Sequence, residues 1–287
     1  MKFKNKVVVI TGAGGGLGRQ LVLQMLAKGA SVAAVDISRA ALEQTELAAG
    51  RDGDRISIHV VDITDNDRVR ELPEEVLRLH GAVDVLINNA GIIQPFITLA
   101  ELDDAAIHRL MNINFFGMLN MTRAFIPFLA ESEAAMIGNV SSMGGFLPVP
   151  GQSIYGASKA AVKIATEGLR MELSKTNIKV SLILPGGIAT DIKKNSGLNV
   201  EPPSEQEKQN AGLSLLQPEE AARIIIKGLE KEKVKIFPGK DSAMMDKLYR
   251  LSPVKAGNMI RKVMAKNHGG VINTTEKLLH MRLKKAM

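Results

Sequence analysis

The sequence predicts an α/β fold in which a doubly wound parallel β-sheet carries helices on both faces. Short runs of β-branched and other apolar residues alternate with longer amphipathic segments. Runs that are apolar on both faces are typical of parallel strands covered by helices on each side. Glycine and polar residues follow several runs, at the strand ends where open α/β sheets bind ligands. The expected strands cover residues 6–11, 31–36, 56–62, 83–88, 136–141, 180–184 and 234–237.

The size and composition of the chain favour one main domain. Of its 287 residues, 45% are hydrophobic and 23% are charged, as in ordinary globular proteins. We assign residues 1–237 to the α/β domain and residues 238–287 to a basic, methionine-containing helical extension. Because the chain has no cysteine, disulfides and thiolate zinc sites are excluded. The histidines show no metal-ligand spacing, so we predict no metal site.

A glycine-rich turn follows the first expected strand and opens a helical pattern over residues 17–28. The turn reads Thr11-Gly12-Ala13-Gly14-Gly15-Gly16-Leu17-Gly18. Glycine lets a diphosphate approach the backbone, and the N–H groups at a helix N-terminus favour its negative charge. A turn with a purely structural role is the alternative. We predict a Rossmann-type dinucleotide site with contacts from Gly12, Gly14, Gly15, Gly16, Leu17 and Gly18.

The second and third expected strands both end in acidic residues. Asp36 can accept hydrogen bonds from the adenine-side ribose hydroxyls and would repel a 2′-phosphate, which favours NAD over NADP. The alternatives are that Asp36 caps the next helix, or that Arg39 reaches the same pocket as a cation. Asp62 and Ile63 are expected beside the adenine ring, with helix capping by Asp62 or Thr64 as the alternative.

A tyrosine and a lysine stand at the start of a long helical pattern over residues 155–174. Tyr155 and Lys159 are four residues apart, so they share a helix face. A nearby positive charge lowers the pKa of a phenol, which predicts Tyr155 as a general acid/base. Such pairs are also common on exposed helices. The polar ends of the preceding strands, Asn88-Asn89-Ala90-Gly91 and Asn139-Val140-Ser141-Ser142, favour the catalytic interpretation.

These motifs together resemble the short-chain dehydrogenase/reductase family, in the family's order over residues 6–237. They are the glycine turn, Asp62, Asn88 to Gly91, Asn114 within Ile113-Asn114-Phe115-Phe116-Gly117, Ser142, Tyr155 with Lys159, and Pro185-Gly186 followed by Thr190.

The resemblance implies roles for the residues that match. Tyr155 exchanges a proton with the substrate oxygen, which Ser142 positions and polarises. Lys159 holds the nicotinamide ribose and lowers the pKa of Tyr155, and Asn114 supports a water-linked proton relay. Ser142 is preferred to Ser141 because it lies 13 residues before Tyr155, as in the family. Asn112 is the less favoured alternative to Asn114.

Further cofactor contacts are implied at two strand ends. Asn89, Ala90 and Gly91 support the cofactor pocket, while Pro185, Gly186, Ile188 and Thr190 lie near the nicotinamide carboxamide and the pyrophosphate. Residues 185–217 are too long for an ordinary connection. They are interpreted as a mobile lid, with a surface insertion as the alternative.

The predicted activity is reversible hydride transfer between NAD and a secondary alcohol or ketone. A non-catalytic dinucleotide-sensing or scaffold protein on the same fold is the alternative. The surroundings of the expected pocket are mostly apolar, which favours a lipophilic steroid, retinoid or long-chain substrate. They comprise Ile92, Ile93, Gln94, Pro95, Met143, Gly144, Phe146, Pro148, Val149 and Gln152.

Long apolar helices over residues 105–130 and 155–174 resemble those that form the family's dimer interface, which implies a homodimer or homotetramer. No secretion signal or membrane-spanning run is recognised, so the expected location is cytoplasmic.

The net charge of +7 is concentrated in the tail. Residues 233–287 contain 13 Lys and Arg against 3 Asp and Glu, with two aromatic residues, Phe237 and Tyr249, and no nucleic-acid-binding module. We therefore predict no nucleic-acid partner. Helical stretches over 241–251, 253–266 and 274–285 are expected to pack over the pocket or on a neighbouring subunit. Peripheral contact with an anionic membrane is the alternative. Helical spacing is expected to gather many of the apolar residues of these stretches on one side, and these residues are Met244, Met245, Leu248, Leu251, Met259, Ile260, Val263 and Met264.

Overall fold

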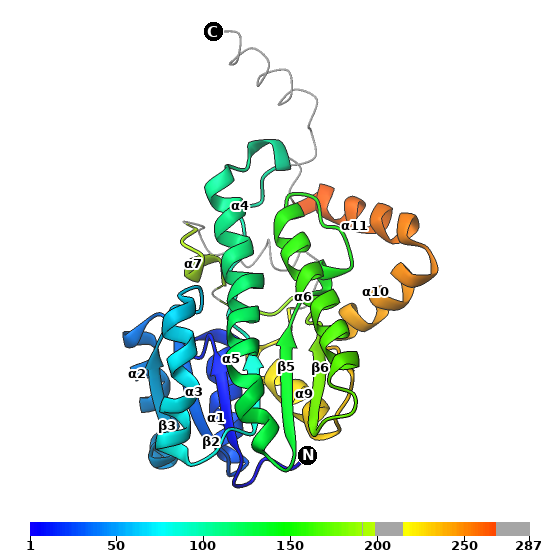
Figure 1. Cartoon of the computed structure of the whole chain (residues 1–287). Coiled ribbons are helices and arrows are strands. Elements are labelled where there is room, and N and C mark those ends of the chain that lie inside the picture. Colours follow the sequence, from blue (N-terminus) through cyan, green and yellow to red (C-terminus); the bar gives the residue numbers. More distant parts are fainter. Residues whose placement is uncertain (191, 199–214, 268–287) are drawn as a thin grey trace.

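The sheet of the computed structural model has seven parallel strands in the order β3-β2-β1-β4-β5-β6-β7 (Figure 1). The structure describes residues 1–190, 192–198 and 215–267, with side chains up to residue 264. The strands are β1 (Val7–Thr11), β2 (Ser31–Asp36), β3 (Ile56–Val60), β4 (Val85–Asn88), β5 (Ala135–Val140), β6 (Ile178–Ile183) and β7 (Lys235–Ile236).

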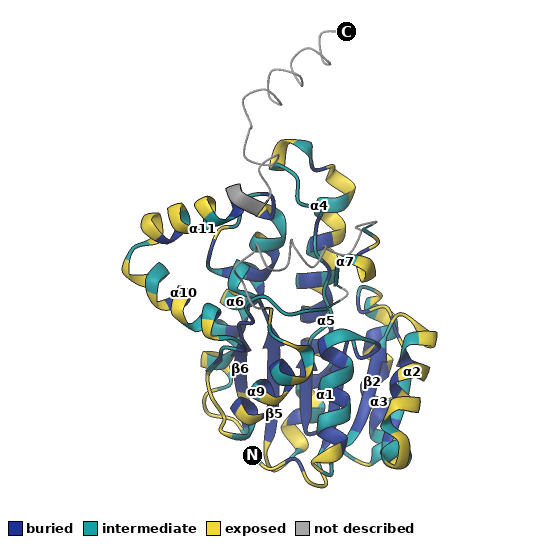
Figure 2. Ribbon diagram, turned by 180° about the vertical axis from the view of Figure 1, so that it is seen from behind, coloured by how far each residue is buried: buried dark blue, intermediate teal, exposed yellow. Residues whose placement is uncertain are grey.

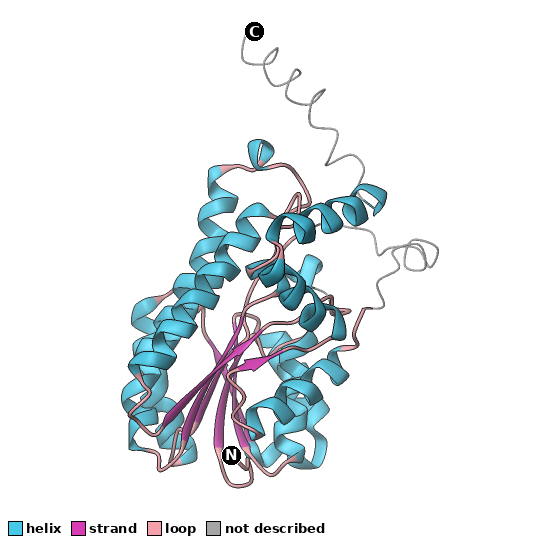
Figure 3. Cartoon of the chain, turned by 90° about the vertical axis from the view of Figure 1, so that its right-hand side faces the viewer, coloured by secondary structure: helices cyan, strands magenta, loops and turns pink. Residues whose placement is uncertain are grey.

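Helices cover both faces of this sheet, which Figure 3 shows between its two helical layers. One layer comprises α1 (Gly16–Ala27), α2 (Arg39–Ala49) and α9 (Pro218–Glu230). The other comprises α3 (Asn66–His80), α5 (Met118–Glu131) and α6 (Ser153–Glu172). The remaining helices are η1 (Gly50–Arg55), η2 (Leu99–Glu101), α4 (Asp104–Met111), η3 (Asn112–Gly117), η4 (Met143–Gly145), α7 (Ile192–Asn195), α10 (Lys240–Leu251) and α11 (Pro253–Asn267).

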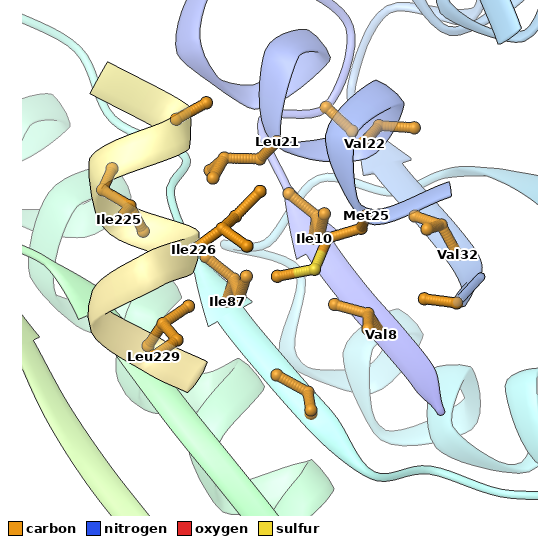
Figure 4. Close-up of a cluster of buried hydrophobic side chains, with 14 of the residues drawn as sticks. Val8, Ile10, Leu21, Val22, Met25, Val32, Ile87, Ile225, Ile226 and Leu229 are labelled. Atoms are coloured by element: carbon orange, nitrogen blue, oxygen red, sulfur yellow. The ribbon is translucent and has the colours of Figure 1, made fainter. Parts of the chain in front are cut away.

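Alternate residues of each strand point into opposite cores. In β1, Val8 and Ile10 pack with α1 and α9, whereas Val7 and Val9 face α3 and α5. Figure 4 shows Ile10 among side chains from α1, α9 and β4, all of them buried. Burial is concentrated in the sheet and on the inward sides of its helices (Figure 2). The prediction of a doubly wound parallel sheet is therefore confirmed.

The strand order reverses at β1, which pairs with β2 on one side and with β4 on the other. In open α/β sheets, ligands bind beyond the carboxyl ends of the strands at such a switch point. The glycine turn follows β1 directly, and the Asn88 to Gly91 segment begins at the end of β4. The topology thus brings two of the predicted motifs to one crevice.

Several predicted boundaries differ from the structure. The expected helix over 105–130 consists of α4 and α5 joined by η3, one turn of π-helix. Strand β3 ends at Val60, and β7 has only two residues. The expected tail helix over 274–285 lies outside the described residues, as does the 199–214 part of the expected lid.

Candidate functional site

The glycine turn after β1 has a backbone conformation and close contacts that exclude a side chain at Gly12 and at Gly18. Gly12 has a φ of +65°, and a Cβ there would lie 2.9 Å from the Cα of Ala90. A Cβ on Gly18 would overlap the carbonyl oxygen of Gly12. The first turn of α1 can therefore pack on the turn only because both residues are glycine.

The N-terminus of α1 is open beside this turn. Gly15 is its N-cap, with no side-chain cap, and its first turn contains no acidic residue. A Cβ on Gly15 would meet only the amide nitrogen of Asn195, 3.8 Å away, and Gly16 lies beside the methyl group of Thr190. The N–H groups at the start of α1 and the partly exposed backbone of Gly15 and Gly16 fit a dinucleotide diphosphate. Leu17 itself points into the core, with 8% of its surface exposed.

Asp36 lies against the turn at the end of β2. Its carboxylate accepts hydrogen bonds from the backbone N–H of Gly14 at 2.9 Å and of Ser38 at 3.0 Å. Ser38 caps α2 by accepting from the N–H of Ala41, so the alternative role of Asp36 as the helix cap is wrong. Arg39 is exposed in the first turn of α2.

Asp62 occupies the same edge beyond β3. It is exposed, and it accepts hydrogen bonds from the backbone and hydroxyl of Thr64 at 2.9 and 2.7 Å. Asp65 caps α3, so neither Asp62 nor Thr64 does. The neighbouring Ile63 is buried against Gly117 of η3.

The ends of β1 and β4 are tied together by one hydroxyl. Thr11 Oγ1 accepts from the backbone N–H groups of Asn89 and Ala90, both at 3.0 Å. The Asn89 side chain donates in return to the Thr11 carbonyl at 3.0 Å. These bonds make the predicted cofactor segment part of the wall behind the glycine turn.

The predicted catalytic residues of β5 and α6 converge. A Cβ on Gly144 would lie 3.4 Å from Cε1 of Tyr155 and 3.5 Å from Oγ of Ser142, so the two side chains lie close together beside this glycine. The adjacent Ser141 is buried and donates to the Lys159 carbonyl at 2.7 Å, which leaves it facing away from that pair. The geometry therefore agrees with the choice of Ser142 over Ser141.

Lys159 and Asn114 meet beside Gly91. A Cβ on Gly91 would lie 3.0 Å from the Lys159 Nζ and 3.1 Å from the Asn114 Oδ1. The Lys159 ammonium donates to the Val140 carbonyl at 3.1 Å. Asn112, the alternative to Asn114, is exposed, whereas Asn114 is 1% exposed.

Asn114 also connects to the backbone of Tyr155. Its amide donates to the Ser158 hydroxyl at 3.0 Å, and that hydroxyl donates to the Tyr155 carbonyl at 2.8 Å. The other bonds of the Asn114 side chain go to the backbone of Ile92. The π-turn η3 that carries Asn114 is thus joined to the first turn of α6.

Burial controls the ionisation of the two groups on α6. It raises the pKa of the Tyr155 phenol above its usual value, and the nearby Ser142 side chain acts in the opposite direction. Burial also lowers the pKa of the Lys159 ammonium to about 8. Desolvation thus outweighs the effect of Ser142 on the Tyr155 pKa, and the effect expected of Lys159 on that pKa stays a prediction.

Sequence reasoning missed the positioning role of Gln94. Its side-chain oxygen accepts from the backbone N–H groups of Ile154 at 3.0 Å and of Tyr155 at 2.8 Å. Helix α6 has no side-chain cap from its own N-cap residue, Gln152. A residue about sixty positions earlier in the chain supplies the cap instead, and no local pattern signals this.

The segment after β6 closes around the same edge. The Pro185 carbonyl accepts from Met143 N at 2.8 Å, which ties this segment to the Ser142 turn. Ile188 pairs with Leu216 in an isolated bridge, and Thr190 lies beside Gly16. Gly186 packs so closely on Asp241 of α10 that a Cβ there would overlap the carboxylate.

A cavity of about 510 Å³ lies beside η4 and the first turns of α6. Tyr249 of α10 contributes to its wall, whereas Ser142 and Tyr155 do not line it. The residues expected around the substrate are thus divided. The cavity is lined by Gly144, Phe146, Pro148, Val149 and Gln152. It does not include Ile92, Ile93, Gln94, Pro95 or Met143.

The doubly wound sheet and the glycine turn at its switch point define the class of dinucleotide-binding α/β proteins. The family model described as short chain dehydrogenase matches residues 6–201. The chain belongs to the short-chain dehydrogenase family of oxidoreductases, which use nicotinamide cofactors.

Named relatives agree with this placement. The chain is 34% identical to the Mycobacterium tuberculosis protein "Putative oxidoreductase SadH", over 87% of this chain and 91% of that protein. A Burkholderia phymatum short chain dehydrogenase/reductase, solved with NAD, has a TM-score of 0.78 and 26% identity, covering 87% and 94% of the two chains. A Burkholderia cenocepacia short chain dehydrogenase, solved with NADP, has a TM-score of 0.75 and 28% identity, covering 91% and 99%.

Two other features of the described residues bear on the site. None of their helices is long and apolar enough to cross a membrane. They also contain no cluster of three or more His, Cys, Asp or Glu side chains that could hold a metal ion.

Proposed function

We propose that this protein transfers hydride between NAD and a lipophilic secondary alcohol or ketone. The observation that carries the proposal is the half-buried Tyr155, which lies with Ser142 beside Gly144 and stands one helical turn before the buried Lys159. The bound cofactor would supply or accept the hydride, and its diphosphate would lie on the open N-terminus of α1.

Tyr155 and Ser142 handle the proton and the oxygen of the substrate in this scheme. A carbonyl oxygen placed between the two hydroxyls accepts a hydrogen bond from each, and it gains negative charge as the carbonyl carbon is reduced. The raised pKa keeps the Tyr155 phenol protonated at neutral pH, so it can donate its proton to that oxygen. Lys159 orients the nicotinamide ribose, and Asn114 links the proton path to solvent.

Asp36 supports the choice of NAD. Both carboxylate oxygens are fixed by backbone N–H groups, so the negative charge is held at the end of β2, where a ribose 2′-phosphate would arrive. We expect NAD to bind at least about tenfold more tightly than NADP, which corresponds to about 1.4 kcal/mol. Titration of both cofactors by fluorescence measures this ratio. The Asp36→Asn variant should reduce it, whereas Asp62→Asn serves as the control at a second strand end.

The substrate class is tested by a turnover screen. Apolar residues lie on the segments that carry the site: Ile92 is buried and bonded through its backbone to Asn114, and Met143 and Phe146 pack on an apolar cluster after β5. Steroid, retinoid and long-chain alcohols and ketones should therefore exceed short polar alcohols in kcat/KM. Turnover on none of these compounds, together with intact NAD binding, would contradict the catalytic proposal and favour a dinucleotide-sensing role.

We also propose that the protein forms a homodimer or homotetramer. Phe116, Ile164 and Met171, on η3 and α6, are 49, 63 and 62% exposed. Burial of such side chains in an interface is favourable. Light scattering that finds only a mass of about 31 kDa, the mass of one chain, at micromolar concentration would contradict this.

A further inference from the structure

The hairpin formed by α10 and α11 has one face packed on the protein. Met245, Ala256 and Met264 are buried, and Leu147 lies in the same cluster as the first two. The Ser242 hydroxyl also donates to the carbonyl of Leu184 at 2.6 Å. Figure 1 shows α10 leaving the sheet and α11 returning above α6, with the connection between them at the periphery. The orientation of the hairpin is therefore fixed by its inner face.

We call residues 250–255, which join the two helices, the hairpin corner. Leu251 is 85% exposed and Val254 is 75% exposed, while Pro253 between them is also exposed. Leu251 is the most exposed large hydrophobic residue among those that the structure describes. The outward side of the hairpin carries further exposed residues along both helices (Figure 2).

The charges around this corner have a single sign. Asp246 is buried and pairs with Arg250 at 2.7 Å, and Asp241 accepts from the N–H of Gly187. No acidic side chain is exposed between residues 240 and 264, where side chains are described throughout. The exposed charged residues are Lys240, Lys247, Arg250, Lys255, Arg261 and Lys262.

We propose that the hairpin corner docks on an anionic lipid surface. Leu251 and Val254 enter the boundary between headgroups and acyl chains, and the surrounding cations contact the lipid phosphates and carboxylates. This combination of protruding aliphatic side chains and one-sign charge is complementary to an anionic bilayer. The inner face of the hairpin remains packed while it docks, so no unfolding is required.

The positive charge around the hairpin corner also disfavours a second copy of this chain as its binding partner. A two-fold interface places the same patch of both copies face to face, which would bring their cations together without an acidic partner. The phosphates of a nucleic acid would pair with the cations. They would provide no apolar surface against which Leu251 and Val254 could be buried. An anionic bilayer satisfies both kinds of side chain.

Vesicle sedimentation with the full chain tests the proposal. The vesicles consist of phosphatidylcholine alone, or with about one third phosphatidylserine. We expect at least about tenfold tighter binding to the anionic vesicles, and loss of about tenfold or more in Leu251→Glu and Val254→Glu. Lys255→Gln should weaken binding by about fivefold. Leu47→Glu on α2 is the matched control, because Leu47 is 82% exposed and lies next to Glu46.

The outcomes separate this proposal from the catalytic one. Tyr155→Phe should bind vesicles like the unmodified protein, and Leu251→Glu should keep its NAD affinity and melting temperature. Equal binding to both kinds of vesicle, or unchanged binding in both corner variants, would overturn the proposal. Binding to duplex DNA without binding to anionic vesicles would overturn it as well.

Discussion

Two segments lie at the same edge of the sheet but present different chemical groups to a ligand. They are the turn between β1 and α1 and the segment from β5 to α6. In the turn, Gly12 and Gly18 let backbone segments pack directly against each other, and the groups offered to a ligand are N–H donors at the start of α1. In the β5–α6 segment, Ser142 and Tyr155 offer hydroxyls, and distant side chains such as Gln94 hold the backbone. The comparison predicts that substitutions in the first region weaken cofactor binding, and that substitutions in the second slow turnover.

The largest expected effect is that of Tyr155→Phe. The ring is retained and only the exchangeable proton is lost, so kcat should fall by roughly 100-fold to 10,000-fold while NAD affinity changes little. Steady-state kinetics and a cofactor titration measure the two quantities. Near-normal turnover on an authentic substrate would remove Tyr155 from the mechanism.

A smaller effect is expected from Gly18→Ala in the turn. The added methyl group would overlap the Gly12 carbonyl, and such overpacking typically costs about 1–3 kcal/mol. NAD should therefore bind roughly tenfold or more weakly, measured by titration. Gly53→Ala in η1 is the control, because a Cβ there meets nothing within 4 Å. Equal NAD affinities in the two variants would refute the proposal that close packing of Gly18 on Gly12 is needed for cofactor binding.

Gln94→Leu tests the second region, the segment from β5 to α6. The variant leaves two N–H groups at the start of α6 without their cap, which should cost about 1–2 kcal/mol and lower the melting temperature by a few degrees. Because Tyr155 loses its anchor, kcat should fall more than NAD affinity does. Gln24→Leu, which removes one exposed hydrogen bond to Glu219, is the control and should leave kcat unchanged.

The smallest effect concerns a histidine cluster between β3 and α3. Ser57 on β3 bonds to the rings of His59 and His80, and His59 also pairs with Glu75. Burial lowers the pKa of both histidines, although Glu75 opposes this at His59. The unfolded chain thus binds more protons just below pH ~6.5, so stability is present above that pH and falls as the pH decreases.

Melting temperatures between about pH 7.5 and 5.5 test this sign. Replacement of His59 by Gln should flatten the pH dependence without changing kcat at neutral pH. A dependence as steep as that of the unmodified protein would assign the proton uptake to other groups.

The sequence predicted the sheet well because burial on both sides leaves a local pattern in each strand. Ser142 could be distinguished from Ser141 by its spacing from Tyr155, and the structure agrees. The direction of the Tyr155 pKa could not be predicted, because desolvation depends on everything packed around the ring. The contribution of Gln94 was missed for a similar reason, since its partners lie far along the chain.

The C-terminal helices show the same limit. Helical spacing predicts that many apolar residues of the tail share one side, from a set that includes Met244, Leu251 and Met264. In the structure Met264 is buried, whereas Met244 and Leu251 are exposed. Spacing identifies an amphipathic helix, but the direction in which the hairpin folds back decides which apolar residues it covers.

The π-turn η3 has a consequence for protein engineering. Its wider winding shifts the rotational phase between α4 and α5, so the faces of these two helices cannot be aligned by one continuous heptad scheme. A chimera that joined α4 of one relative to α5 of another through a regular α-helix would rotate Asn114 away from Gly91 and Ser158. A chimera in this part of the chain should therefore exchange α4, η3 and α5 together, as the single segment 104–131.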